Sequence, residues 1–370
     1  MKHNSKIYIA GHKGLVGSAI LKELQEKGYR NLIYRSHNEL DLANSEEVKA
    51  FFEKERPEYV FLAAAKVGGI EANNTYRADY IYENLMIQNN VIHQSFKTEV
   101  KKLLFLGSTC IYPKNCSQPM KEDSLLTGPL EYTNEPYAIA KIAGIKMCES
   151  YNLQYNTNFI SLMPTNLYGP NDNFDLKKSH VLPALVRKMH LGKALEEGNW
   201  NLIREDLLKR PIEGIDSSSN ENEIIEVLNS FGIEKTYERN VTVTIWGTGT
   251  PKREFLYSQN LGEACVYVMK NVDFPDLLNQ NLEQTKAEVR NTHLNIGTGE
   301  DISIEQLAIL IKSKIGFEGN LIFDTSKPDG TPRKLTDVSK INSLGWRHSI
   351  ELPEGVEKLY DWYLQDTHNK

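Results

Sequence analysis

Residues 7–17 of this 370-residue chain read IYIAGHKGLVG, an apolar run followed by Gly11, Gly14 and Gly17 in the spacing GxxGxxG. The apolar run predicts a strand, and the pattern from Leu15 onward predicts a helix. Glycines in such a turn let a ligand approach the backbone at the helix N-terminus, where free N–H groups favour an anion. The stretch therefore indicates a phosphate-binding strand–turn–helix unit, with an ordinary glycine-rich turn as the alternative.

Further apolar runs at residues 32–34, 59–63 and 102–106 alternate with helical patterns. Strands that alternate with helices indicate parallel strands joined by helical crossovers. We therefore predict an α/β fold with a Rossmann-type doubly wound parallel sheet. Residues 1–165 would form a nucleotide-binding domain, and residues 166–370 mainly a smaller C-terminal α/β substrate domain, with some crossing of the chain between the two.

The second half begins with a predicted helix at 181–190, followed by a polar stretch over 192–240 that we interpret as an insertion. The end of the insertion predicts a helix, because four apolar residues fall at helical spacing: Ile224, Ile225, Leu228 and Phe231. A strand at 241–246 and an αβ segment over 304–362 follow. The insertion is either a solvated surface excursion or a part that shapes the substrate site.

The composition is that of a globular protein, with 40% hydrophobic and 25% charged residues and a net charge of −6. No dense Lys/Arg block is present, which argues against nucleic acid as a partner. Without a long apolar run or a signal-peptide pattern we expect a cytoplasmic protein that does not contact a membrane. The cysteines form no CxxC pair, so we expect free thiols and no metal site; they are Cys110, Cys116, Cys148 and Cys265.

The tip of the second predicted strand reads Tyr34-Arg35-Ser36-His37, without an acidic residue. An acid at this position binds the ribose hydroxyls of NAD, whereas an arginine tolerates the 2′-phosphate of NADP. Lys13, in the glycine loop, supplies a second cation. The pattern favours NADPH over NADH, although Asp41 follows a few residues later.

Tyr137 and Lys141 form a Tyr-x-x-x-Lys element on a predicted helix, where positions i and i+4 share one face. A lysine cation there is expected to lower the pKa of the tyrosine, so that the phenol exchanges protons near neutral pH. Ser108 follows a predicted core strand, at the sheet edge where ligands bind in such folds. In this order Ser108, Tyr137 and Lys141 resemble the short-chain reductase triad.

Cys110 stands two residues after Ser108, and His180 begins the helix that we expect to cross the substrate pocket. Epimerising a centre next to a ketone needs one group to remove the α-proton and another to return one, which a thiol and an imidazole can do. A cysteine here also argues against a sugar-nucleotide 4,6-dehydratase, whose family pattern has an acid after the threonine. The alternative is a buried structural cysteine and a surface histidine.

Over nearly its whole length the chain resembles the GDP-L-fucose synthase family of extended short-chain dehydrogenases. The resemblance lies in six blocks: AGHKGLVGSAI (10–20), AAAKVGGI (63–70), GSTCIYPK (107–114), PTNLYGP (164–170), WGTGTPKREF (246–255) and SKPDGTPRK (326–334).

The family resemblance implies a role for each matching residue. It implies that Ser108, Tyr137 and Lys141 reduce the substrate and that Cys110 and His180 are the epimerase pair. The GDP-sugar would be bound by Lys188, Trp246, Arg253 and Asp329, since cations suit a pyrophosphate and an indole suits a base or sugar face. The cofactor would contact Gly11, His12, Lys13, Gly14, Leu15, Val16, Gly17, Arg35, Asp41, Ala63, Ala64, Leu106, Gly107, Ser108, Tyr137, Lys141, Pro164, Asn166, Leu167 and His180.

Two features depart from the family pattern: His37 replaces the arginine usual in bacterial fucose synthases, and the insertion over 192–240 is long. Similar architectures include reductases of GDP-linked 6-deoxy-heptoses used in bacterial capsules, some of which leave epimerisation to a separate enzyme.

We therefore expect NADPH-dependent C4 reduction of a GDP-4-keto-6-deoxy sugar, giving GDP-L-fucose or a GDP-6-deoxy-heptose, with or without C3/C5 epimerisation. A nucleotide-sensing binding protein is the alternative from another class. A homodimer through the helices after Asn84 and Tyr137 is expected by resemblance.

Overall fold

The computed structural model describes residues 1–236, 240–278 and 288–368, which form two compact units. The first unit comprises Met1–Leu167, Glu254–Glu300 and Leu335–Ser349. The second comprises Tyr168–Arg253, Asp301–Lys334 and Ile350–Lys370. Residues 254–300 and 335–349, which the predicted boundary assigned to the substrate domain, thus belong with the first unit, because they supply a strand and helices to its sheet.

A six-stranded parallel sheet is the centre of the first unit. Its strands lie in the order β11-β5-β4-β3-β1-β2, and each paired neighbour is parallel. The strands are β1 (Ile7–Ala10), β2 (Leu32–Ile33), β3 (Tyr59–Leu62), β4 (Lys102–Leu106), β5 (Phe159–Pro164) and β11 (Leu294–Ile296). The predicted Rossmann-type sheet is confirmed, and the predicted strands at 7–10 and 102–106 have the observed bounds.

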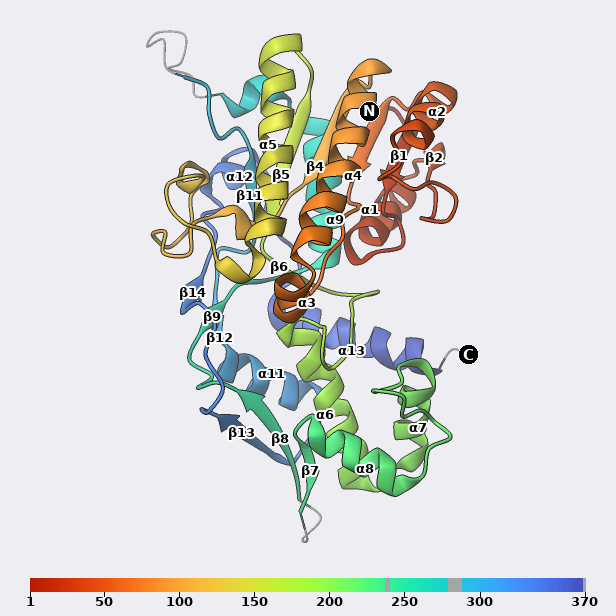
Figure 1. Cartoon of the computed structure of the whole chain (residues 1–370), viewed down its shortest axis with the longest axis vertical. Coiled ribbons are helices and arrows are strands. Elements are labelled where there is room, and N and C mark those ends of the chain that lie inside the picture. The colour runs from red at the N-terminus through yellow and green to blue at the C-terminus, as the bar shows by residue number, and fades with distance from the viewer. Residues whose placement is uncertain (237–239, 279–287, 369–370) are drawn as a thin grey trace. The chain divides into compact units, whose positions relative to one another are not determined.

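Helices cover both faces of this sheet (Figure 1). One face carries α2 (Ser45–Glu55), α4 (Arg77–Lys97) and α5 (Glu135–Tyr155), and the other carries α1 (Leu15–Glu26), α9 (Ser258–Asn271) and α12 (Ser339–Ser343). Alternate residues of β1 enter the two cores: Tyr8 packs on the side of α2, and Ile9 on the side of α1. The sheet is therefore buried on both sides, as expected for parallel strands.

Short elements complete the first unit. They are α3 (Ile70–Thr75), the 3₁₀ turns η1 (Thr109–Ile111), η2 (Glu122–Ser124), η3 (Tyr132–Asn134) and η4 (Phe274–Leu277), and β10 (Phe255–Tyr257), which pairs with β6 (Asn166–Tyr168). Among the residues that the structure describes, no helix combines the length and apolar character needed to cross a membrane.

The second unit contains two small sheets with helices around them. One sheet has the order β13-β8-β7 and the other β12-β9-β14. The strands are β7 (Ile233–Lys235), β8 (Val241–Trp246), β9 (Lys252–Arg253), β12 (Ile302–Ser303), β13 (Asn320–Asp324) and β14 (Arg333–Lys334). The helices are α6 (Val181–Glu197), α7 (Trp200–Lys209), α8 (Glu221–Ser230), α11 (Ile304–Ile315) and α13 (Leu352–His368).

The insertion differs from its prediction in two respects. Gly192, its expected first residue, lies inside α6, where an added Cβ would come 3.1 Å from the Phe317 ring, so the insertion begins after Glu197. Helix α7 was not predicted. The predicted helix near residue 224 is present as α8, with Ile224 and Leu228 completely buried. The insertion therefore has an apolar side of its own and is not a loose surface excursion.

Candidate active site

The glycine loop lies between β1 and the N-terminus of α1. Gly11 has a φ of +86°, and an added Cβ would come 2.8 Å from the Ala64 nitrogen; at Gly17 it would lie 2.1 Å from the Gly11 carbonyl oxygen. Gly14, the N-cap of α1, has only that oxygen near its Cβ position, at 3.6 Å. The first and third glycines are thus required by packing. The second leaves the helix N-terminus open to a phosphate.

The loops after β1 and β3 meet at the carboxyl edge of the sheet. Ala63 donates its N–H to the Ala10 carbonyl over 3.1 Å, and Ala64 lies against Gly11. Leu106 and Gly107 end the next strand along this edge, and Gly107 donates to the Leu162 carbonyl over 2.8 Å. The carboxyl edge is where open α/β sheets bind nucleotides.

Two cationic side chains lie near the tip of β2, and they differ in whether they already have an ionic partner. The Arg35 guanidinium donates to Glu55 Oε1 over 3.0 Å and lies 5.7 Å from the centroid of the Phe51 ring. Lys13 is exposed. The His12 ring lies 4.6 Å from the Tyr34 ring, which extends the surface beside these cations. Lys13 can therefore bind an incoming anion, whereas the charge of Arg35 is already partly neutralised by its ion pair with Glu55.

An acidic residue that the sequence reasoning missed lies at this tip. The Glu39 carboxylate accepts from the Ser36 N–H over 2.7 Å and from the Ser36 hydroxyl over 2.6 Å, and these bonds lower its pKa. The spacing Ser-x-x-Glu, typical of a capping box, could have indicated this contact. Asp41 Oδ1 accepts from the Ala43 N–H over 2.9 Å, which engages that oxygen locally.

Helix α5 presents Tyr137 and Lys141 at the end of β4. Gly144 allows a close approach, since a Cβ there would come 2.5 Å from the Phe105 ring. Lys141, 3% exposed, donates from Nζ to the Leu106 carbonyl over 2.8 Å. The same Nζ lies 5.6 Å from the centroid of the Tyr137 ring. The Tyr-x-x-x-Lys pair thus shares one helix face, as its spacing predicted.

Burial decides the protonation of this pair. It lowers the pKa of Lys141 to about 8, while the nearby Cys110 raises that pKa slightly. It raises the pKa of Tyr137 far above its usual value, with further increases from Cys110 and Tyr80. Desolvation is therefore the main influence on the pKa of the Tyr137 phenol, and an acidifying effect of Lys141 stays a prediction. Tyr137 is a protonated donor at neutral pH.

Ser108 and Cys110 lie at the same edge of the sheet. Ser108 caps the turn η1, and its Oγ accepts from the Cys110 N–H over 3.3 Å. Both residues are half-buried, and Cys110 acts electrostatically on Tyr137 and on Lys141. The first unit thus brings the predicted triad and Cys110 into one neighbourhood. None of the four cysteines forms a disulfide, as expected.

The remaining cofactor candidates of the first unit lie on or after β5. Pro164 ends β5, and Asn166 and Leu167 belong to β6. The Asn166 amide donates to the Glu254 carbonyl over 2.8 Å, so one of its donors is already engaged.

In the second unit, helix α6 carries two predicted residues. His180 is its N-cap and is exposed. Lys188 is half-buried, and its Nζ donates to the Thr244 carbonyl over 3.0 Å. Burial lowers the pKa of Lys188 to about 8.

The other substrate candidates belong to β8, β9 and the segment before β14. Trp246, at the end of β8, is 70% exposed. Asp329 accepts from the Thr248 N–H over 2.9 Å and from the Thr248 hydroxyl over 2.7 Å. The Arg253 guanidinium donates to the Thr331 carbonyl over 2.6 Å; burial lowers its pKa, and Asp329 opposes this. Asp329 thus contacts the turn after Trp246 and also acts electrostatically on the half-buried Arg253.

Lys327 is a cation that the sequence reasoning did not select. Its Nζ lies 5.5 Å from the centroid of the Trp246 ring. Its position in the block SKPDGTPRK, beside Asp329, is the signal that could have indicated it.

Over its described residues the structure holds no group of His, Cys, Asp and Glu side chains suited to a metal ion.

The chain belongs to the NAD-dependent epimerase/dehydratase family, whose model matches residues 7–206 and 218–281. The resemblance to GDP-L-fucose synthases is confirmed: the chain is 46% identical to the GDP-L-fucose synthase of Escherichia coli strain K12, over 98% of this chain and 97% of that protein.

Two solved structures from Campylobacter jejuni are similar throughout. One is a GDP-6-OMe-4-keto-L-xylo-heptose reductase, 50% identical with a TM-score of 0.90, covering 99% of each chain. The other is a GDP-mannoheptose C4 reductase with NADP bound, 50% identical with a TM-score of 0.84, covering 98% of this chain and 99% of that one.

Proposed function

We propose that this protein is an NADPH-dependent oxidoreductase that reduces the C4 ketone of a GDP-4-keto-6-deoxy sugar. The observation that carries the proposal is the buried Lys141 ammonium beside the protonated Tyr137 phenol, at the carboxyl end of β4. The named relatives, which are GDP-sugar synthases and reductases, support the same reaction class.

The first unit has the features that NADPH requires. The open position at Gly14 suits a pyrophosphate at the N-terminus of α1, and Lys13 and Arg35 suit a 2′-phosphate. Ala63, Ala64, Leu106 and Gly107 line the carboxyl edge beside the loop. NADPH supplies the hydride when it is bound.

The chain's own residues supply the proton and hold the carbonyl. Tyr137 donates its phenolic proton to the oxygen that becomes the alcohol, and the Ser108 hydroxyl holds that oxygen by a hydrogen bond. Lys141 stabilises the tyrosinate left behind, because its charge lies on the same helix face. A phenol with a raised pKa stays protonated until the alkoxide forms, which suits a reductase.

The second unit supplies groups that suit a GDP moiety. Lys188 and Arg253 carry positive charge with carbonyl partners, which a pyrophosphate can replace or add to. The exposed face of Trp246 suits a planar base or a sugar ring. Asp329 orders the turn after Trp246 through its two bonds to Thr248.

Epimerisation at C3 or C5 depends on Cys110 and His180, in the assignment that the family resemblance implies. In one form of the proposal they move the α-protons before reduction, giving GDP-L-fucose or its equivalent. In the other the enzyme only reduces, for example a GDP-6-deoxy-heptose, and these two residues orient the sugar. The second form is supported by the similar Campylobacter proteins, which are named as heptose reductases.

We further propose a cytoplasmic homodimer that serves the synthesis of cell-surface or capsular polysaccharide. Helices α4 and α5 lie side by side on one face of the sheet (Figure 1). They expose the apolar residues Tyr82, Ile139, Leu153 and Tyr155, which suit a contact between subunits.

The deciding experiment is NADPH oxidation, followed by absorbance, with a panel of GDP-4-keto-6-deoxy hexoses and heptoses and with NMR of each product. Stoichiometric oxidation with formation of the 4-hydroxy sugar is the expected result. Tight NADPH binding without oxidation by any member of the panel would overturn the proposal and favour a nucleotide-sensing protein.

A further inference from the structure

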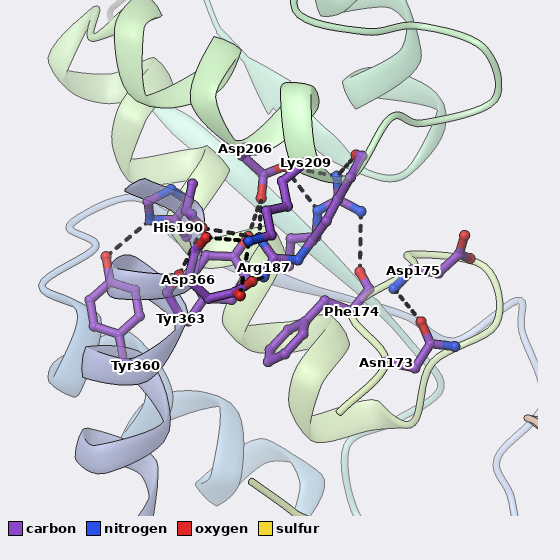
Figure 2. A network of polar contacts seen from close by, with 12 residues as sticks. Asn173, Phe174, Asp175, Arg187, His190, Asp206, Lys209, Tyr360, Tyr363 and Asp366 are labelled. Carbon is purple, nitrogen blue, oxygen red and sulfur yellow. Dashed lines mark hydrogen bonds and ion pairs between the residues drawn. The ribbon is translucent and has the colours of Figure 1, made fainter. Parts of the chain in front are cut away.

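A buried ion pair joins α6 to the inserted helix α7 (Figure 2). Arg187 on α6 and Asp206 on α7 have side chains that are 1% and 0% exposed. The guanidinium donates twice to Asp206 Oδ2, from Nε over 3.0 Å and from Nη2 over 2.8 Å. A fully buried pair with two bonds is broken only at high cost, since either charge alone would lack compensation.

The pair extends to the C-terminal helix and to the end of α7. The Tyr363 hydroxyl on α13 donates to Asp206 Oδ1. Arg210, which follows α7, lies 3.9 Å from the same oxygen and pairs with Asp366. The Asp206 carboxylate is therefore the point at which α6, α7 and α13 are joined.

This network also holds Phe174, in the segment that precedes α6. Arg187 donates from Nη1 to the Phe174 carbonyl over 3.2 Å. The Phe174 ring is buried against Tyr363, with 4.8 Å between centroids, and the Arg210 guanidinium lies 5.3 Å from its centroid. Both the backbone and the ring of Phe174 are thus fixed by groups that depend on α7.

From Phe174 to His180 the backbone is held by successive hydrogen bonds. Asp175 Oδ1 accepts from the N–H groups of Lys177 and Lys178, over 2.9 and 2.8 Å. The Asp175 carbonyl accepts from the Ser179 N–H over 2.9 Å, and His180 then begins α6. A displacement of Phe174 would therefore pass along a bonded turn to the His180 side chain.

We propose that Asp206, supplied by the insertion, is a positioning residue for His180. It fixes the Arg187 guanidinium, which holds the Phe174 carbonyl and with it the turn that leads to His180. The inference rests on the proposed function in that it takes His180 to act on the sugar. The insertion then serves the reaction from within the second unit, through its contacts with α6 and α13.

The test compares Asp206→Asn with two other variants of the full-length protein. Arg204→Met is the matched control, because Arg204 donates to the Ser219 carbonyl over 2.9 Å within the insertion and, in the part of the chain that the structure describes, makes no hydrogen bond to Arg187 or Phe174. The double variant Arg187→Met/Asp206→Leu removes both charges and should fold even where Asp206→Asn does not, since apolar replacement of a buried pair is often tolerated.

Hydrogen–deuterium exchange of the peptide covering residues 173–180 gives the first readout, and it needs no substrate. We expect amide exchange there to become at least about tenfold faster in Asp206→Asn and in the double variant, and to stay unchanged in Arg204→Met. Unchanged exchange in the folded double variant would overturn the inference, whatever the activity of the protein.

A double-mutant cycle with His180→Asn gives the second readout. In the parent background, Asp206→Asn should lower the kcat for reduction of the GDP-sugar about tenfold. The dissociation constant for GDP should stay within about twofold of the parent value. In the His180→Asn background the same change should have no further effect on kcat. Equal losses in both backgrounds would show that Asp206 acts independently of His180. Absence of turnover in the parent enzyme would instead refute the proposed function. The exchange result would still show whether Asp206 holds the turn that leads to His180.

Discussion

Two regions of the protein bury positive charge in opposite ways. Around Asp206, the buried Arg187 and the half-buried Arg210 have carboxylate partners. Among the candidate site residues, Lys141 of the first unit and Lys188 of the second donate to backbone carbonyls instead, and burial lowers the pKa of each to about 8. A cation that is neutralised inside the protein holds elements together. A cation left with a neutral partner can still attract a substrate or stabilise an anion.

The largest effects are expected when one tyrosine hydroxyl is removed from each region. Tyr137→Phe should lower the rate of reduction by a factor of about 10² to 10⁴, because the proton donor is lost, without lowering stability. Tyr363→Phe, which removes the donor to Asp206, should mainly destabilise the protein, by about 1–3 kcal/mol. Steady-state kinetics and urea unfolding of both variants give the answer. Near-normal turnover in Tyr137→Phe would refute the mechanism.

The paired region should respond to the loss of one charge by losing stability. Arg187→Met leaves the Asp206 carboxylate buried without its main partner, and we expect a loss of about 3–5 kcal/mol in the free energy of unfolding. Denaturant unfolding monitored by circular dichroism measures it. A loss below about 1 kcal/mol would mean that water reaches the pair.

At Lys188, which follows Arg187 in the sequence, we expect the opposite effect on stability. Lys188→Met removes a half-buried cation that donates to the Thr244 carbonyl and not to a carboxylate, so stability should hold or rise. Binding of the GDP-sugar should weaken about tenfold to a hundredfold, the scale of one charge-assisted hydrogen bond. Calorimetric titration with GDP, alongside thermal unfolding, separates the two effects. A large fall in melting temperature with unchanged GDP affinity would assign Lys188 to the fold instead.

The pH dependence of GDP binding sharpens the same point. Lys188 is charged below its pKa of about 8, and an adjacent phosphate favours the charged form and raises that pKa. GDP affinity should therefore be constant below about pH 7 and weaken as the pH rises above 8. Binding at pH 8 should take up part of a proton, which titrations in buffers of different ionisation enthalpy detect. Lys188→Arg should remove this dependence; its persistence would assign the titration to another group.

The smallest effect is expected at the exposed cation of the cofactor site. Lys13→Ala should reduce the preference for NADPH over NADH by about twofold to fivefold, because exposed charge pairs contribute only about 0.2–1 kcal/mol. The ratio of kcat/KM for the two cofactors measures it. Equal efficiency with both cofactors in the parent enzyme would show that His37 and Glu39 have removed the discrimination.

The sheet and its nucleotide loop could be predicted from the sequence because their signals are local. Ile7–Ala10 and Gly11, Gly14 and Gly17 have a spacing that few other structures require, and the structure explains Gly11 and Gly17 by close contacts and Gly14 by the open helix N-terminus. The Tyr137–Lys141 pair is equally local, since one helical turn separates the residues.

What the sequence missed depends on contacts between distant segments or on dehydration. Helix α7 has a single buried apolar side, and its Asp206 reads as a solvated charge until Arg187 and Tyr363 surround it. The raised pKa of Tyr137 depends on the desolvation of its hydroxyl, which spacing does not reveal. The assignment of residues 254–300 and 335–349 to the first unit depends on strand pairing over long sequence distances.

The discontinuity of the first unit bears on how the polypeptide matures. Strand β11 completes the sheet beside β5, although Ile296 lies more than a hundred positions after Pro164. A nascent chain that ends near residue 165 therefore has neither this neighbour for β5 nor α9 to cover Ile160 and Leu162. Such a chain presents a long apolar edge, a known hazard for intermolecular strand pairing. Completion of the nucleotide-binding half has to wait until residues 254–300 and 335–349 have been translated, so a fragment that ends near residue 165 would aggregate instead of serving as a minimal cofactor-binding module.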